Sequence, residues 1–271
     1  MESTILTDLV FGGCSGILTG ILVAPMEYLK VIMQTNKLNI VQSIQSDQSL
    51  KKMLKSIPQF SSICVVVLGL EFSVNERIKK NYGTCAGIVA SALTGGWFLT
   101  AADHLMFRRE KGEITRNTFK NLSKIGIFSL WTGFFPMIMR EAIFMSSVTH
   151  LGPKFGRILK KLFDDSDTIS ITWNSIGRIF TGVICTFFSH PFDILARKMQ
   201  INLFNNPEKK SSIVSCFKEI QQEAKSSNLK NINHPFFKGA IPRMGVVTFG
   251  GVFAGGFFEM FKRHFGYKLD H

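Results

Sequence analysis

The sequence has little of what a secreted, metal-binding or catalytic protein needs. Its five cysteines are odd in number and lack a CxxC spacing, so they are interpreted as free thiols. The six histidines show no metal-ligand spacing. Residues 1–8 contain no basic region ahead of a short apolar core, and we expect no removable secretory signal. No set of nucleophile, base and orienting group stands out, so the sequence does not favour an enzyme or predict a cofactor.

Acidic residues are scarce relative to basic ones. The chain has 19 Asp and Glu against 32 Lys and Arg, a formal net charge of +13, while 45% of its residues are hydrophobic. The basic residues form short clusters between apolar segments rather than one aromatic-rich face, so we expect no nucleic-acid partner. This layout is typical of a helical membrane protein beside anionic lipid.

Apolar stretches near the length that crosses a bilayer, about 20 residues, occur six times in the sequence. Small and polar residues interrupt every one of them, which suits helices that face one another or a watery cavity. The six stretches lie roughly at 5–34, 57–80, 84–107, 134–160, 170–200 and 238–264.

Longer polar stretches follow the first, third and fifth apolar segments. Each has room for a short amphipathic helix, and in the last one Ile213, Phe217 and Ile220 stand at helical spacing. The links after the second and fourth segments are short by comparison. The longer stretches cover residues 36–56, 110–131 and 202–236.

The order of long helix, polar loop with a small helix, and second long helix therefore occurs three times. We predict an all-α membrane protein with six transmembrane helices in three pseudo-symmetric two-helix repeats. The repeats would be residues 1–82, 83–165 and 166–271 of one domain. Six crossings put both termini on the same side of the membrane. Internal repeats commonly build transporters, with the substrate site near the midplane where the repeats meet.

Two of the odd-numbered segments end in one pattern, VAPMEYLKVIMQT at 23–35 and SHPFDILARKMQI at 189–201. Both contain a proline, one further residue, an acid, and then a base within five positions. A proline inside a helix removes a backbone hydrogen bond and kinks the axis. An acid and a base three residues apart share a helix face. Three such helices would close one end of a bundle with a ring of ion pairs.

This pattern resembles the signature of the mitochondrial carrier family, Pro-x-Asp/Glu-x-x-Lys/Arg in each odd-numbered helix. Pro25, Glu27 and Lys30 match the first copy, and Pro191 and Asp193 match the third. The resemblance implies that these five residues belong to a gate on the matrix side. It also implies a multi-pass protein of the mitochondrial inner membrane with both termini in the intermembrane space.

Further motifs carry the same resemblance. WTG at 131–133 and FKG at 237–239 resemble the aromatic-basic-Gly element that precedes even-numbered helices. In the family, the glycines at these helix starts bind cardiolipin phosphate on backbone amides. The resemblance thus implies a bound lipid at Trp131, Gly133, Phe237 and Gly239, although Trp131 and Phe237 also suit simple interface anchors. The glycines spaced by four that resemble the family's close helix packing are Gly12, Gly16 and Gly20.

The matrix-side motif is incomplete in the second and third repeats. In the second, Ala101 replaces the proline and Met106 the inner base, although Asp103 and Arg108 remain. In the third, Ala196 occupies the inner basic position.

By the family's pairing scheme, we expect only the ion pair of Lys30 with Asp103 to survive at this gate. Glu27 and Asp193 would lose their partners unless a neighbouring base reaches around. The bases in question are Arg108, Arg197 and Lys198.

The opposite end shows the same weakening. Glu76 with Lys79, and Glu259 with Lys262, resemble the family's even-helix closing motif and imply a gate on the cytoplasmic side. The aligned stretch of the fourth helix, GPKFG at 152–156, has no acid. Degraded motifs at both ends bear on function, because alternating access needs two closed states of nearly matched stability.

Arg140 and Glu141 fall at the family's substrate-contact position on the fourth helix. An adjacent base and acid resemble carriers of amino acids and related zwitterions, and a guanidinium binds a carboxylate through two hydrogen bonds. An internal ion pair that stabilises the bundle explains the two residues equally well. The matching positions on the second and sixth helices are apolar, at Ile63, Cys64 and Val246.

Two functions remain open. The first is transport of a small carboxylate or amino-acid-like metabolite by alternating access, with membrane lipid and the solute as partners. The second is a non-transporting, carrier-derived accessory subunit of a larger inner-membrane complex, such as a respiratory complex. The lost gate residues favour the second, while the fold class favours the first.

Overall fold

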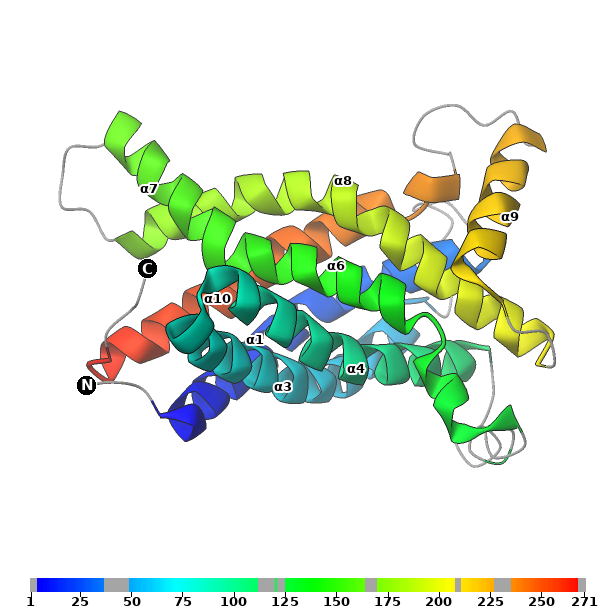
Figure 1. The fold of residues 1–271 in the computed structure, drawn as a ribbon, viewed down its shortest axis with the longest axis horizontal. Helices are drawn as coiled ribbons and strands as arrows, with labels where there is room; N and C mark the ends of the chain where they lie inside the picture. The colour runs from blue at the N-terminus through cyan, green and yellow to red at the C-terminus, as the bar shows by residue number, and fades with distance from the viewer. Residues whose placement is uncertain are drawn as a thin grey trace.

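The computed structural model describes residues 4–36, 49–111, 120, 125–163, 170–207, 211–226 and 235–267. Within these residues the chain forms helices and no strands (Figure 1). Six helical stretches are long and apolar enough to cross a membrane, which confirms the predicted fold class. These spans are Ile5–Gln34, Met53–Tyr82, Thr84–Arg109, Ile127–Phe163, Thr172–Asn205 and Pro235–His264.

Five of the spans contain one long helix each, and the fourth is divided by a π-helical turn, η2. The 3-10 helices η1 and η4 form the beginnings of the fourth and sixth spans, and α9 follows the fifth. The elements are α1 (Ile5–Asn36), α3 (Ser49–Tyr82), α4 (Thr84–Glu110), η1 (Ile127–Trp131), α6 (Phe134–Ser146), η2 (Ser147–Leu151), α7 (Gly152–Phe163), α8 (Ser170–Asn205), α9 (Ile213–Ser226), η4 (Pro235–Phe237) and α10 (Ala240–His264).

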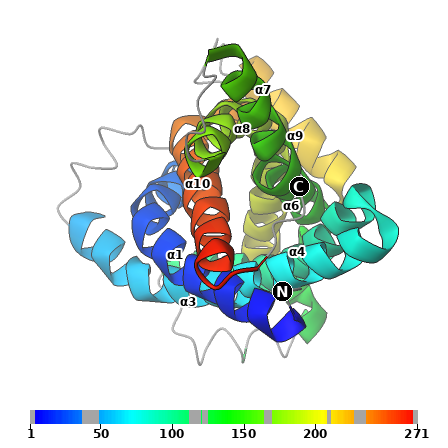
Figure 2. The same ribbon diagram turned by 90° about the vertical axis from the view of Figure 1, so that its left-hand side faces the viewer.

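The spans form a closed ring around a common centre, as the view along the bundle shows (Figure 2). Each helix contacts the next in chain order, from α1 through α3, α4 and α6 with α7 to α8 and α10, and α10 returns to α1. The beginning of α1 and the end of α10 lie at one end of the bundle, here called the terminal end (Figure 1). Helix α9 lies at the other, the loop end.

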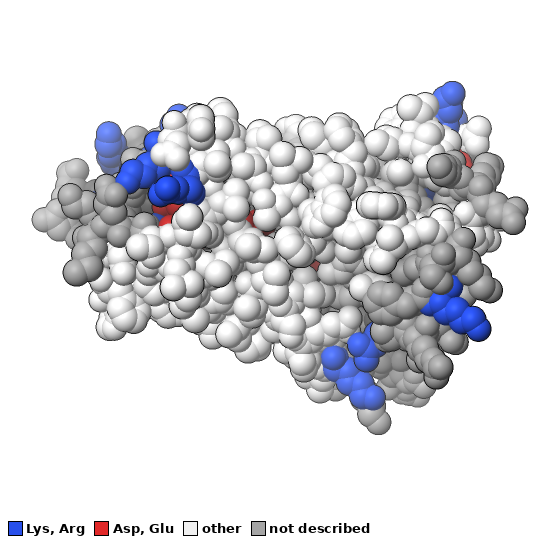
Figure 3. Space-filling view, turned by 60° about the horizontal axis from the view of Figure 1, so that its bottom comes forward, with Lys and Arg blue, Asp and Glu red and all other residues white. Residues whose placement is uncertain are grey.

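An apolar belt separates the two ends of the molecule (Figure 3). Lysine and arginine gather at both ends, and the middle of this face is almost free of charge. The belt includes large side chains that point outward at helical spacing, such as Val89, Leu93 and Trp97 on α4. Burying them in lipid removes their apolar surface from water, so the belt matches a bilayer core.

Glycines bring α1 and α3 into close contact, as the spacing of Gly12, Gly16 and Gly20 predicts. A Cβ atom on Gly12 would lie 2.7 Å from the Leu68 carbonyl oxygen, and one on Gly20 would lie 2.5 Å from the Ser61 Cα. A Cβ on Gly16 would overlap the Cys64 carbonyl group. Small residues at this spacing let helix backbones approach without side chains between them.

The predicted amphipathic helix of the third polar stretch is α9. Ile220 is buried and Ile213 packs beside it against Ile194 and Leu195 of α8, while Phe217 is largely exposed. The face predicted from the three residues is therefore only partly buried. Most of the first two polar stretches, including residues 37–48 and 112–119, lies outside the described residues.

Replacing Gly16 by alanine should destabilise the bundle, because overpacking a close contact costs about 1–3 kcal/mol. Gly13→Ala is the matched control, since a Cβ there meets Val65 only at 3.6 Å and the helix gains about 1 kcal/mol of propensity. Thermal unfolding in mild detergent measures both. Gly16→Ala should melt below the wild type and Gly13→Ala should not; equal melting temperatures would contradict this packing.

Candidate functional site

A cavity of about 80 Å³ lies between the spans, with walls from α1, α3, α4, α6 and α10. A volume of this size holds several water molecules. We call it the central cavity. Cys64 and Val246, which stand at the predicted contact positions, line it with other apolar side chains. Its charged lining residues are Glu27, Glu71, Asp103, Arg140, Glu141 and Arg243.

Arg140 and Glu141 both reach the central cavity from α6. This helix begins after Gly133, whose φ of 88° is a left-handed conformation that glycine adopts at little cost. Arg140 and Glu141 are buried, with Nη2 of Arg140 lying 2.6 Å from Oε1 of Glu141. They therefore form an ion pair, and both charges face the space where a solute would lie.

Asp193 on α8 connects Arg140 to α1. Its Oδ1 lies 2.7 Å from Nη1 of Arg140 and 3.3 Å from Nζ of Lys30, and its Oδ2 accepts a 2.8 Å hydrogen bond from Gln34. The expectation that Asp193 loses its partners is therefore wrong. Two cations and an amide from two other helices converge on this one buried carboxylate, and one of those cations also lines the central cavity.

Asp103 pairs with Arg197 rather than with Lys30. Its Oδ1 lies 2.7 Å from Nη2 of Arg197, and both side chains are buried. The predicted pair of Lys30 with Asp103 is thus wrong, because Lys30 turns instead to Asp193 on α8 and to Glu27 on its own helix. Arg197 supplies the base that Ala196 lacks by reaching Asp103 from the next position along α8.

The other two bases considered as replacements have different contacts. Lys198 lies 2.6 Å from Glu223 of α9 and is partly exposed. Arg108 donates from Nε to His104, one turn earlier in α4, at 3.0 Å. Neither forms an ion pair with Asp103, Glu27 or Asp193. Of these three bases, Arg197 is therefore the one that pairs with a gate acid among the described residues.

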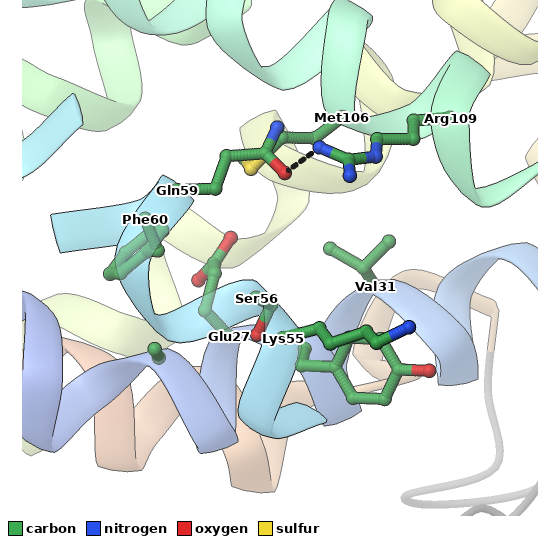
Figure 4. Close-up of a pocket in the computed structure, with 10 residues that line it drawn as sticks. Glu27, Val31, Lys55, Ser56, Gln59, Phe60, Met106 and Arg109 are labelled. Carbon is green, nitrogen blue, oxygen red and sulfur yellow. Dashed lines mark hydrogen bonds between the residues drawn. The ribbon is translucent and has the colours of Figure 1, made fainter. Parts of the chain in front are cut away.

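Glu27 is the gate acid that gains no partner from another helix in the described part of the chain. Its Oε1 lies 2.5 Å from Nζ of Lys30 on the same helix, and its Oε2 is buried without a hydrogen bond. Met106 stands where the family's pattern has a base. In the space beside it lies a second cavity of about 210 Å³, the side pocket, into which Glu27 points (Figure 4). Glu27, Phe60 and Met106 line both cavities, so the two adjoin.

Charged contacts also cross the bundle at the terminal end. Lys262 of α10 lies 2.7 Å from Glu76 of α3 and 3.2 Å from Asp8 of α1. Glu259 pairs with Arg178 of α8 and accepts a 3.1 Å hydrogen bond from Asn174. Glu76, Glu259 and Lys262 are thus brought together with partners that the sequence did not indicate.

An apolar cluster lies between these contacts and the central cavity. Phe72 of α3 stacks on Phe258 of α10 with ring centroids 4.3 Å apart, and Val148 and Phe11 pack against them. The cluster joins the second, fourth and sixth spans to the first. The terminal end is therefore closed by apolar packing as well as by charge. At the loop end, ion pairs and hydrogen bonds between the spans are accompanied by one aromatic contact, in which the ring centroids of Phe107 and Phe204 lie 5.6 Å apart.

Sequence reasoning missed three buried charges, Glu71, Arg178 and Arg243. Glu71 is fully buried, and Nε of Arg243 is buried with no hydrogen-bond partner among the described residues. Each stands within an apolar span, and an ionisable residue in such a segment is itself a signal of function. The three fall outside the positions that the family motifs mark.

The residues predicted to bind lipid occupy the starts of the fourth and sixth spans. Trp131 donates from Nε1 to the Trp97 carbonyl at 3.0 Å, and its ring packs on the Trp97 ring. Gly133 and Gly239 have left-handed φ values of 88° and 79° and precede α6 and α10. A surface groove at the loop end is lined by Trp131 and Gly133 together with Arg108 and Phe204. Within the described residues, no group of His, Cys, Asp and Glu could hold a metal ion.

Comparison with known proteins gives two matches. Residues 1–61 and 170–269 match the family model described as mitochondrial carrier protein. The mitochondrial substrate carrier family protein X of Dictyostelium discoideum is 20% identical over 270 residues, covering 89% of this chain and 86% of that protein. Residues 62–169, where Ala101 and Met106 depart from the motif, lie outside the matched segments.

The pairing of Asp103 can be tested by a double-mutant cycle. Asp103→Asn and Arg197→Gln should each lower the melting temperature, because breaking a buried pair costs about 3–5 kcal/mol. Together they should cost less than the sum, with a coupling of at least about 1 kcal/mol.

The cycle of Asp103→Asn with Lys198→Gln is the matched control. Lys198 is the next residue and pairs elsewhere, so the two effects should add within about 0.5 kcal/mol. Equal coupling in both cycles, or additivity in the first, would mean that Arg197 is not the partner of Asp103.

Proposed function

Because this chain belongs to the mitochondrial carrier family, we propose that it moves a small carboxylate or amino-acid-like metabolite across the mitochondrial inner membrane by alternating access. The family consists of transporters rather than enzymes, and the six spans make the chain a multi-pass mitochondrial membrane protein. The observation that carries the proposal is the double role of Arg140. It faces the central cavity and also binds Asp193, the carboxylate that joins α1, α6 and α8.

This arrangement supports a direct coupling between solute and gate. A solute carboxylate that binds the Arg140 guanidinium competes with Glu141 and Asp193 for the same N–H groups. Asp193 then keeps only Lys30 and Gln34 as partners. The loop end loses a contact when the solute binds, so part of the binding free energy opens the gate. A ligand can shift the balance between a closed and an open state only if it binds the two with different affinity.

Gate roles follow from the same reasoning. Lys30, Asp193, Asp103 and Arg197 would close the loop end, with Pro25 and Pro191 setting the turn of α1 and α8 towards it. Glu27 belongs to this gate through Lys30.

At the terminal end, Glu76 and Lys262, which the sequence assigned to two different motif copies, join the second and sixth spans and would act in the cytoplasmic-side gate. Glu259 joins them through Arg178 of α8. Lys79 is exposed to a greater degree than Lys262 and would act near the rim. The loop end would face the matrix and both termini the intermembrane space.

We also propose that one carrier domain is divided into three repeats, at 1–82, 83–165 and 166–271. A second inference is that a cardiolipin molecule binds at the loop end. The first backbone N–H groups of α6 and α10 follow positive-φ glycines, and helix starts of this kind bind phosphate well. The groove beside Trp131 offers aromatic and apolar walls for acyl chains. Phe237 and Gly239 hold the corresponding place before α10.

Uptake into proteoliposomes tests the proposal. Arg140→Lys keeps the charge but loses the planar fork that binds a carboxylate bidentately, and Arg140→Gln loses both. We expect each to lower the uptake of labelled amino acids or small carboxylates at least about tenfold, since one charge-assisted contact contributes about 1.5–3 kcal/mol. The exposed residue Arg157 provides the control, Arg157→Gln, which should transport at the wild-type rate.

The accessory-subunit alternative gives a different outcome. Its supporting observation is Met106, which leaves Glu27 with a base on its own helix alone. A wild-type protein that takes up no solute, and that co-migrates in fixed ratio with a respiratory-size assembly after mild-detergent extraction, would refute transport. The surviving ion pairs would then stabilise a static bundle.

A further inference from the structure

Glu71 is a buried carboxyl group that has no partner in the part of the chain that the structure describes. It lies on α3, is fully inaccessible to solvent, and neither of its oxygens accepts a hydrogen bond within the described residues. Its side chain lies in the wall of the central cavity, which Arg140 and Glu141 also line. A Cβ atom on Gly95 of α4 would overlap the carboxyl group, so glycine there makes the room that Glu71 occupies.

The other buried acids of the protein are all neutralised. Six of them lie within 4.0 Å of a lysine or arginine nitrogen, and Glu71 alone among the described buried acids does not. The described buried acids are therefore paired with a lysine or arginine, and Glu71 is the exception among them. The six are Asp8, Glu27, Asp103, Glu141, Asp193 and Glu259.

An uncompensated buried carboxylate costs several kcal/mol, so a carboxyl group in this position stays neutral with a bound proton unless a cation lies beside it. A cation that binds beside Glu71 would take the place of that proton and stabilise the ionised carboxylate. Of the two bases in the cavity wall, Arg140 already binds Glu141 and Asp193, and Arg243 forms no ion pair or hydrogen bond with Glu71 in the described structure. The cation that completes Glu71 therefore comes from outside the chain.

The chemistry of the surroundings narrows that cation to an organic ammonium. Val67 and Leu68 beside Glu71 are apolar, and a hard metal ion needs six or more oxygen ligands that the described cavity does not gather. An ammonium group carries three N–H donors and needs few acceptors. Across the same cavity, Arg243 presents a guanidinium whose Nε has no hydrogen-bond partner in the described chain. An acidic group and a guanidinium in one cavity suit the two ends of a zwitterion.

We propose that Glu71 binds the ammonium group of a zwitterionic solute, of the amino-acid class, whose carboxylate is held by Arg140 and Arg243. This assignment rests on the transport function proposed above and names its substrate class. It adds a binding residue on α3, about two helical turns beyond the predicted contact positions Ile63 and Cys64. Three spans, the second, fourth and sixth, would then each contribute a charged contact.

Matched ligand pairs test the proposal directly. The full-length protein in mild detergent is heated with each L-amino acid and with the 2-oxo acid that carries a carbonyl oxygen in place of its ammonium group. We expect at least one amino acid to raise the melting temperature and its 2-oxo partner to bind at least tenfold more weakly. In Glu71→Gln, that preference should vanish.

Stability without ligand provides the internal check. Glu71→Gln replaces an unpartnered carboxyl group by a neutral amide of the same shape, so the unliganded variant should melt at or above the wild-type temperature. A clear fall would mean that Glu71 has a structural role and would overturn the proposal. Glu223→Gln, which alters a partly exposed carboxylate on α9, should leave every ligand shift unchanged.

The remaining outcomes separate this inference from the proposed function. Equal stabilisation by amino and 2-oxo acids, unaltered in Glu71→Gln, would overturn the ammonium site and leave transport of a carboxylate standing. Stabilisation by 2-oxo acids that needs Glu71 and grows at acidic pH would make Glu71 a proton carrier instead. No shift with any compound, together with no uptake in proteoliposomes, would refute both.

Discussion

Asp193 accepts contacts from two other helices, and the loop end of the bundle depends on this single carboxylate. Lys30 and Gln34 bind it from α1, and Arg140 binds it from α6. A carboxylate removed from water is stable only when its charge and its lone pairs are satisfied, so these partners cannot leave without replacement. The same requirement ties the cavity to the gate, because one of the partners is Arg140. A change in what Arg140 binds must alter how α1, α6 and α8 are held.

The two ends of the bundle are closed by different proportions of charged and apolar contacts. The loop end relies on ion pairs, which can exchange one partner for another of like charge. The terminal end adds the stacked rings of Phe72 and Phe258, whose separation exposes apolar surface at about 25 cal/mol per Å². Under the proposed transport function, a charged solute would therefore act first on the loop end. Opening the terminal end requires compensating contacts elsewhere, since two states must stay within a few kcal/mol to interconvert.

Because Met106 stands where a base would pair with Glu27, the loop end has fewer ion pairs beside the first repeat than beside the third. The pair that a base at this position would make with Glu27 is absent, and the side pocket fills that corner between α1, α3 and α4. A gate with fewer ion pairs opens at a lower cost, which shifts the balance between closed states. The apolar closure of the opposite end would then determine how long each state lasts.

Sequence patterns predicted the six spans and the close approach of α1 and α3, because both depend on local periodicity and side-chain size. They failed for the partners of Lys30 and Asp103. Neighbouring positions on a helix differ by about 100° in direction, so a base shifted by one position is not expected to face the same acid. The flexible side chain of Arg197 nevertheless crosses to Asp103. Glu71 was missed because its isolation is a property of the packed bundle: burial without a partner is visible only once all six spans surround it.

Cys64 offers a native probe of alternating access, because it is buried and lines the central cavity. The decisive measurement is its labelling by a membrane-impermeant thiol reagent in oriented vesicles, with Cys14, Cys85, Cys185 and Cys216 replaced by serine. Alternating access predicts labelling from both sides of the membrane, and faster labelling from the loop-end side in Asp193→Asn. Protection from both sides, in the wild type and the variant alike, would contradict a moving gate.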